Sequence, residues 1–230
     1  MVFNSIPLLV FIFCFFIVYF STKGKARLII TLLASYLFYG WWDYRFLLLI
    51  IISTLIHYYL SIVIHKETDE GRRKQKLALS MILNLGILGF FKYFNFFIDS
   101  ANDLLGLTGQ DATFSTLHII LPVGISFYTF QSMSYTIDVY RRVIEPEPQF
   151  IRFATYIAFF PQLVAGPIVR AVDFLPQLKS DRPFNWTNFQ LGLSQVVLGF
   201  AKKVVIADSL AVFVDAIFAY PGNYTSLALI

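Results

Sequence analysis

The sequence predicts an all-α protein that crosses a membrane several times. Of its 230 residues, 57% are hydrophobic and only 14% are charged, whereas soluble domains average about 45–50% apolar and about 25% charged residues. The mean hydropathy is +0.68. The apolar residues gather in runs near the length of about 20 residues that a helix needs to cross a bilayer. An integral membrane protein is therefore the predicted class, and the lipid bilayer is its first predicted partner.

About six apolar runs before Arg170 approach the length of a membrane segment. The first follows the leader MVFNS, which has no basic residue, and no small-residue cleavage site comes after it. We therefore expect a retained helix rather than a signal peptide. The predicted membrane segments cover residues 6–20, 26–42, 45–64, 77–98, 117–140 and 150–169.

Basic residues alternate between the connections that join these runs. The second connection contains only Arg45, and the fourth, residues 100–116, contains no basic residue. The first connection contains Lys23, Lys25 and Arg27. The third contains Lys66, Arg72, Arg73, Lys74 and Lys76, and the fifth contains Arg141 and Arg142. Because Lys and Arg favour the cytoplasmic side, we expect these three connections in the cytoplasm and the N-terminus outside. The same pattern accounts for the net charge of +4, and we exclude nucleic acid as a partner.

The run from Leu121 to Arg142 carries an ordered polar edge. At about 100° per residue, its polar residues fall within one stripe roughly 80° wide. The stripe consists of Gly124, Tyr128, Gln131, Tyr135, Asp138 and Arg142. Polar groups at membrane depth usually face a protein interior or a wet cavity, so the last five are candidates for lining a substrate path. The alternative is a structural helix contact in which Asp138 and Arg142 pair at i,i+4 spacing.

The helical pattern weakens after Pro161. Gly166 and Pro167 interrupt it, and Arg170 follows directly. Broken helix at membrane depth is tolerated where it is buried in protein or lines a cavity, so we expect a re-entrant or partly in-plane segment near Pro161–Pro167. Pro167 and Arg170 are candidates for binding an anionic donor through its phosphates, because Arg suits bidentate phosphate contacts. The alternative is a kink whose Arg faces the lipid headgroups.

A helical pattern returns over residues 188–219. Lys202, Lys203, Asp208 and Asp215 interrupt its apolar residues, so we expect an amphipathic or tilted helix rather than a simple span. A new apolar run begins just before the chain ends at Ile230. We therefore expect residues 1–230 to be the N-terminal part of one larger membrane domain.

The histidines and the cysteine predict no metal centre. His57 lies between apolar residues and beside Tyr58 and Tyr59, a setting typical of a hydrogen-bonded interior histidine. His57, His65 and His118 have no second ligand at the spacing of a metal site. The single cysteine, Cys14, excludes an intrachain disulfide within these residues. We expect neither a metal nor another resident cofactor.

Six sequence blocks together resemble the membrane-bound O-acyltransferase family, and within it the branch of alginate, peptidoglycan and other polysaccharide O-acetyltransferases. The blocks are MVFNS with the apolar run after it, LLASYLFYGWW at Leu32–Trp42, LGFFKYFNFF at Leu88–Phe97, LPVGISFYTFQSMSYTIDVYR at Leu121–Arg141, FFPQLVAGPIVR at Phe159–Arg170 and GFAKKVVIAD at Gly199–Asp208. Their order and spacing cover essentially the whole chain. The resemblance implies a multi-pass enzyme of the bacterial inner membrane that moves acetyl groups from a cytoplasmic donor, expected to be acetyl-CoA, to an extracytoplasmic polysaccharide such as alginate. It also implies extracytoplasmic acetylation proteins as partners.

The catalytic histidine of that family is absent from residues 1–230. The family carries it in an apolar helix of the C-terminal half, in a Trp-His-Gly-like setting, and His57, His65 and His118 match neither its motif nor its position. We therefore assign no catalytic residue here, expect the histidine beyond Ile230, and expect these residues alone to be inactive. The alternative is a non-enzymatic membrane protein, either a transporter half or an assembly scaffold.

Overall fold

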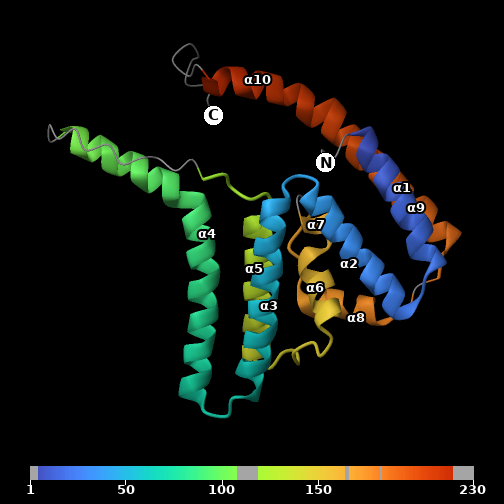
Figure 1. The fold of residues 1–230 in the computed structure, drawn as a ribbon. Helices are drawn as coiled ribbons and strands as arrows, with labels where there is room; N and C mark the ends of the chain where they lie inside the picture. The colour runs from blue at the N-terminus through green and yellow to red at the C-terminus, as the bar shows by residue number, and fades with distance from the viewer. Residues whose placement is uncertain (1–4, 108–118, 164–165, 182, 220–230) are drawn as a thin grey trace. The chain divides into compact units, whose positions relative to one another are not determined.

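The computed structural model describes residues 5–107, 119–163, 166–181 and 183–219, and across these residues it contains helices and connecting segments but no strand (Figure 1). Contacts divide the chain into two units. The first comprises Leu9–Asp181, and the second comprises Arg182–Ile230 with Val2–Leu8. The predicted all-α class is confirmed.

The first unit contains most of the described helices, including all of α1 except its first three residues. They are α1 (Ile6–Ser21), α2 (Gly24–Gly40), α3 (Tyr44–Lys66), α4 (Glu70–Leu107), α5 (Ile125–Tyr140), α6 (Phe150–Ala158), α7 (Phe160–Leu163) and α8 (Ala171–Lys179). Among the described helices, α3 and α4 are long and apolar enough to cross a membrane, and α1 is a shorter apolar helix. The number of six membrane segments stays a prediction.

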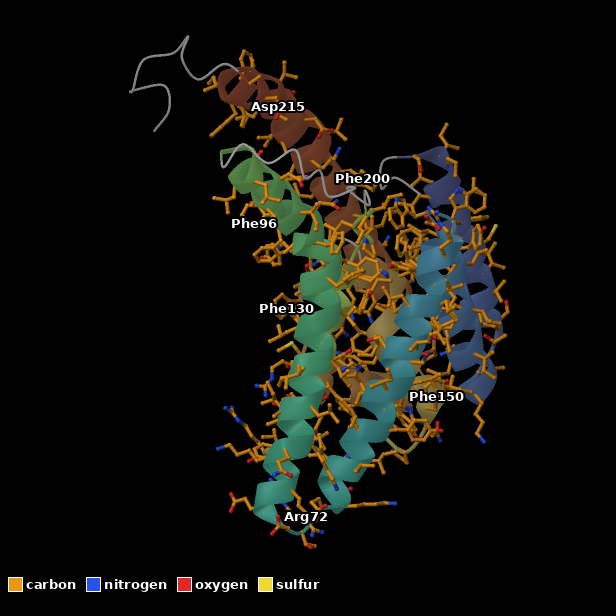
Figure 2. The ribbon with its side chains drawn as sticks, turned by 60° about the vertical axis from the view of Figure 1, so that its left-hand side comes forward. Arg72, Phe96, Phe130, Phe150, Phe200 and Asp215 are labelled. Carbon is orange, nitrogen blue, oxygen red and sulfur yellow. The ribbon has the colours of Figure 1, made fainter. Side chains whose placement is uncertain are left out.

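Helix α4 extends well beyond the apolar run 77–98 that predicted it. Its start is fixed by Asp69, whose Oδ1 accepts a hydrogen bond of 2.7 Å from the backbone N–H of Arg72, as an N-terminal cap does. The side chain of Arg72 lies near the turn from α3, and Phe96 projects from the outer side of α4 (Figure 2). Hydropathy marks the part of a helix that suits hydrocarbon, whereas helical hydrogen bonding continues through polar residues until a breaking signal.

One helix is predicted over the fifth apolar run, residues 117–140, but the described structure differs. Residues 117 and 118 lie outside the described part, and α5 begins only at Ile125. The reason is a turn in which the N–H of Ile125 donates to the carbonyl of Pro122 at 3.2 Å, followed by the left-handed conformation of Gly124 with φ 76°. Proline and a positive φ both interrupt a helix.

The sixth run, predicted over residues 150–169, is also interrupted. Helix α6 ends at Ala158, and Phe159 has φ −56° and ψ 108°. Pro161 has no N–H for the carbonyl of Ile157, so the α-helix cannot continue unchanged. The N–H of Phe160 donates instead to Ser35 Oγ at 3.3 Å. The predicted break near Pro161–Pro167 therefore starts two residues earlier in the described structure.

Two glutamine side chains compensate for this break. The carbonyl of Tyr156 accepts hydrogen bonds from Gln131 Nε2 at 2.8 Å and from Gln162 Nε2 at 3.2 Å. All of these groups are buried. The polar backbone at the end of α6 is thus paired by protein, which is the condition under which broken helix is tolerated at membrane depth.

The core of the first unit forms around α5 and α6. Both helices contribute fully buried aromatic rings, and Tyr135 packs against Phe153 with ring centroids 4.7 Å apart and the ring planes tilted by 43°. Figure 1 shows α5 behind α3, and α5 contacts α3, α4 and α6. Large apolar side chains on α1, α3 and α4 are exposed outside this core, as expected of surfaces that face lipid or further helices.

Residues 186–219 of the second unit form one continuous run of helical backbone. It contains α9 (Trp186–Ala201), a π-helical segment η1 (Lys202–Ala207) and α10 (Asp208–Ala219). None of their residues is buried. Lys203 Nζ lies 2.7 Å from Asp208 Oδ2; the wider π-helical turn brings residues five apart onto one face. The predicted helix 188–219 lies within this run.

Candidate functional site

The polar stripe of α5 lies on the buried face of the helix. Tyr128 and Tyr135 are completely buried, Gln131 is 2% exposed and Asp138 is 4% exposed. Tyr135 accepts a hydrogen bond of 2.8 Å from the backbone N–H of Glu147 through its hydroxyl oxygen. The shared face that helical spacing predicts is therefore present for these four residues.

The stripe is packed within the first unit. Gln131 contacts the end of α6, and Tyr128 lies near Tyr39 of α2. In the described part of the chain, the hydroxyls of Tyr39 and Tyr128 are buried without a hydrogen-bond partner. The hydrogen bond from Gln131 fits a structural helix contact, and the role of the stripe in a substrate path stays a prediction.

Arg142 does not belong to the buried face, so the predicted i,i+4 pair with Asp138 is wrong. Helix α5 ends at Tyr140, and Arg142 is exposed with φ 58°. The N–H of Val143 donates to the carbonyl of Asp138 at 2.9 Å, and the N–H of Arg142 donates to the carbonyl of Val139 at 3.1 Å. These two bonds form a Schellman motif, whose left-handed position is usually occupied by glycine.

Replacing Arg142 with glycine is therefore expected to stabilise the protein. A left-handed conformation costs a non-glycine residue about 1–2 kcal/mol. Glycine removes this cost but also increases the conformational entropy of the unfolded chain, which offsets part of the gain. We expect an increase of about 0.5–1 kcal/mol in the free energy of unfolding, measured by denaturant titration in detergent. Arg142→Val should shift the transition in the opposite direction, because a β-branched residue tolerates a positive φ poorly.

Asp138 pairs instead with Arg170, 32 residues further along the chain. Arg170 Nη2 lies 2.7 Å from Asp138 Oδ1; the aspartate side chain is 5% exposed and the arginine side chain is 54% exposed. The hydrogen bond from the guanidinium to this carboxylate raises the pKa of Arg170 above its ordinary value. Pro167 is exposed in the non-helical stretch before α8. Helical periodicity cannot reveal this pair because its members lie on different elements.

His57 belongs to a polar contact between α3 and α4. Its Nδ1 lies 2.6 Å from the carbonyl of Ser53, and its Nε2 contacts Asn84 Nδ2. His57 and Asn84 are both buried. The ring is thus engaged on both nitrogens, as the sequence predicts for an interior histidine. His118 lies outside the described residues, and those residues contain no group of three or more His, Cys, Asp or Glu side chains that could hold a metal ion.

The basic connections lie at one end of the first unit. Arg73, at the start of α4, donates to the carbonyl of Tyr140 at the end of α5. Gly24, at the start of α2, lines a small hollow together with Gln149 and Arg152. The first, third and fifth connections therefore meet at the same end, although the sequence separates them by up to 120 residues or so.

Two hollows open at this end. The larger, about 370 Å³, lies between the connection after α5 and helix α8, and the smaller, about 160 Å³, lies between the starts of α2 and α6 and the end of α8. Lys179 lines both. Neither is lined by a residue of the predicted stripe, by Pro167 or by Arg170. No sequence motif indicated these hollows, because their walls come from three separate segments.

Comparisons with known proteins agree over nearly the whole chain. Residues 36–229 match the model of the membrane-bound O-acyltransferase family. The chain is 40% identical to the probable alginate O-acetylase AlgI of Pseudomonas aeruginosa over 98% of its length, and 39% identical to that of Azotobacter vinelandii over 95%. It is 34% identical to the peptidoglycan O-acetyltransferase of Helicobacter pylori over 100% of its length.

The chain spans about half the length of these relatives. The matches cover 43%, 44% and 48% of the three proteins, respectively. No solved structure matches the chain.

Proposed function

Because the chain belongs to the membrane-bound O-acyltransferase family, we propose that it forms the N-terminal helices of an O-acetyltransferase that takes acetyl groups from acetyl-CoA in the cytoplasm and transfers them to a polysaccharide outside the membrane. The observation that carries this proposal is the similarity of nearly the whole chain to alginate and peptidoglycan O-acetylating enzymes. Alginate is the acceptor class favoured by the AlgI relatives. Extracytoplasmic acetylation proteins are the proposed partners.

The clustering of basic connections supports the proposed orientation. Arg73 contacts the end of α5, and Gly24 lies beside Arg152, so the charges that orient membrane helices act at one end. This end would face the cytoplasm of a bacterial cell at the inner membrane, with the N-terminus outside. An anionic donor such as acetyl-CoA would meet the protein there.

The Asp138–Arg170 pair is the proposed contact to the donor. The buried carboxylate holds one N–H of the guanidinium at 2.7 Å, and the arginine side chain is 54% exposed. An arginine has five N–H donors in a rigid fork, so a guanidinium fixed on one side can offer others to a phosphate. Asp138 acts here as a positioning residue. Tyr128, Gln131 and Tyr135 continue its buried face toward the other end of α5 and remain the proposed path-lining residues.

The acyl-transfer step itself requires a group beyond these residues. In the proposed reaction, a histidine takes the proton of the acceptor hydroxyl. The hydroxyl oxygen attacks the thioester carbonyl, and the coenzyme A thiolate leaves. His57 does not suit this role, because both its ring nitrogens contact Ser53 and Asn84 in the interior.

Removing Arg170 is expected to weaken donor use. In the full-length protein, Arg170→Ala should raise the KM for acetyl-CoA about 10-fold or more with a smaller effect on kcat, because a charge-assisted hydrogen bond contributes about 1.5–3 kcal/mol. The measurement is transfer of labelled acetyl to polysaccharide in membrane vesicles. Asp138→Ala should mainly lower the folded yield, since it removes the partner that the buried side of the guanidinium contacts.

Arg45→Ala is the matched control for Arg170→Ala. Arg45 also pairs with an aspartate, Asp43, at 2.6 Å, but in the second connection. Its removal should leave the KM for acetyl-CoA unchanged. Equal KM values for the wild type, Arg170→Ala and Arg45→Ala would contradict the proposed role of Arg170. The absence of acetyl transfer by the wild type would favour a non-enzymatic scaffold or transporter half.

A further inference from the structure

We infer that the smaller hollow, between the starts of α2 and α6 and the end of α8, is a binding site for a phosphate group. Lys25, Arg152 and Lys179 line it from three different segments. Its volume of about 160 Å³ suits a compact anion better than a drug-sized ligand, for which pockets start at about 300 Å³. This inference does not depend on acetyl transfer.

The buried carboxylate of Glu147 pairs with two of the three cations, Arg152 and Lys179. Glu147 is 2% exposed, and its Oε1 lies 2.6 Å from Arg152 Nη1 while its Oε2 lies 3.9 Å from Lys179 Nζ. The contact with Lys179 is long, so the ammonium keeps hydrogen-bonding capacity for another acceptor. Glu147 thus fixes the positions of two donors without satisfying them.

Arg152 has a further donor that is not used. Its Nε is buried and, among the described residues, has no hydrogen-bond partner. A buried N–H without an acceptor is costly and normally has a partner. An oxygen of a phosphate in the adjoining hollow would supply one, with the added strength of a charged acceptor.

The one carboxylate on the wall of this hollow is already neutralised. Both oxygens of Asp181 accept hydrogen bonds from the backbone N–H of Gly24, at 2.9 and 3.0 Å. Oδ1 also lies 3.6 Å from Arg27 Nη1. The three cations therefore face an anion without an uncompensated negative charge beside them, and the start of α2 adds a positive dipole end.

A phosphate can reach this site on two kinds of molecule. One is the headgroup of an anionic phospholipid, because basic groups at the end of membrane helices attract such lipids. The other is a soluble phosphate compound in the cytoplasm. The larger hollow shares Lys179 and adds the apolar side chains of Ile144, Val172 and Leu175, which would suit the uncharged part of either molecule.

The test measures phosphate binding by the full-length protein with two probes. Adenosine 3′,5′-bisphosphate is titrated calorimetrically in a neutral detergent, and retention of phosphatidylglycerol against phosphatidylcholine is measured by native mass spectrometry from mixed micelles. We expect the wild type to bind at least one probe. The double variant Lys25→Gln/Lys179→Gln should bind that probe about 10-fold or more weakly, and added salt should weaken binding by the wild type.

The control is Lys66→Gln/Lys74→Gln, which removes two exposed lysines of the third connection, at the same end of the unit. It should bind as the wild type does. Lys25→Glu is a second site variant, since Lys25 is exposed and its replacement disturbs no core packing. If only the site variants lose binding of the bisphosphate, the ligand is a soluble phosphate compound. If only the site variants lose binding of phosphatidylglycerol, the ligand is a lipid headgroup.

Failure of the wild type to bind either probe would overturn the inference, as would equal binding by the site and control variants. Acetyl transfer is measured separately on the same preparations. The wild type could show no acetyl transfer and yet bind phosphate, with binding lost in Lys25→Gln/Lys179→Gln. This result would support the phosphate site and contradict the proposed function.

Discussion

Gly124→Ala is expected to lower the free energy of unfolding by about 2–5 kcal/mol. Gly124 has φ 76°, and an added Cβ would lie 2.5 Å from the carbonyl oxygen of Leu163. The left-handed conformation costs a non-glycine residue about 1–2 kcal/mol, and overpacking a fixed site costs typically 1–3 kcal/mol. Because the atom in the way belongs to the backbone, a side-chain rotation cannot relieve the contact.

The measurement is denaturant-induced unfolding of the full-length protein in detergent, followed by fluorescence. Gly86→Ala is the matched control, since a Cβ added at this exposed position in α4 meets no atom within 4 Å. It should be neutral or stabilising by up to about 1 kcal/mol, because alanine favours helix over glycine. Equal stability of Gly124→Ala and the wild type would show that α5 does not begin as described.

The same glycine shows how far an apolar run predicts a helix. The spacing of Tyr128, Gln131 and Tyr135 correctly indicates one face of a helix. The run does not reveal that the helix starts only at Ile125. That boundary depends on a turn at Pro122 and on the close approach of Gly124 to Leu163, which is a tertiary contact.

The candidate site was predictable only in part for a similar reason. Periodicity compares residues within one helix, so it pairs Asp138 with Arg142. The described partner, Arg170, comes from the start of α8, and the hollow lined by Lys25, Arg152 and Lys179 joins three segments. Charge in the connections predicted a side of the membrane for Lys25, but it made no prediction for Arg152 or Lys179. Which residues converge depends on the break after α6, which Pro161, Gly166 and Pro167 indicated without revealing its geometry.

Asn84→Leu is expected to destabilise the contact between α3 and α4 by about 1–3 kcal/mol. In the wild type, Nδ1 of His57 faces the carbonyl of Ser53, so this nitrogen must carry the proton and donate. Nε2 of the neutral ring is then the acceptor for Asn84 Nδ2. Leucine removes that donor and leaves a buried acceptor without a partner, which costs about 1–3 kcal/mol in mutational series.

A double-mutant cycle separates the interaction from the loss of packing. His57→Leu should also destabilise the protein, whereas His57→Leu/Asn84→Leu should recover part of the loss, because the double variant removes both members of this hydrogen bond. Interhelical hydrogen bonds in membranes average about 0.6 kcal/mol, so the coupling energy should lie near or above that value. Strictly additive effects, measured by unfolding of the full-length protein, would mean that the two side chains do not interact, and that α3 and α4 are held together by their apolar contacts alone.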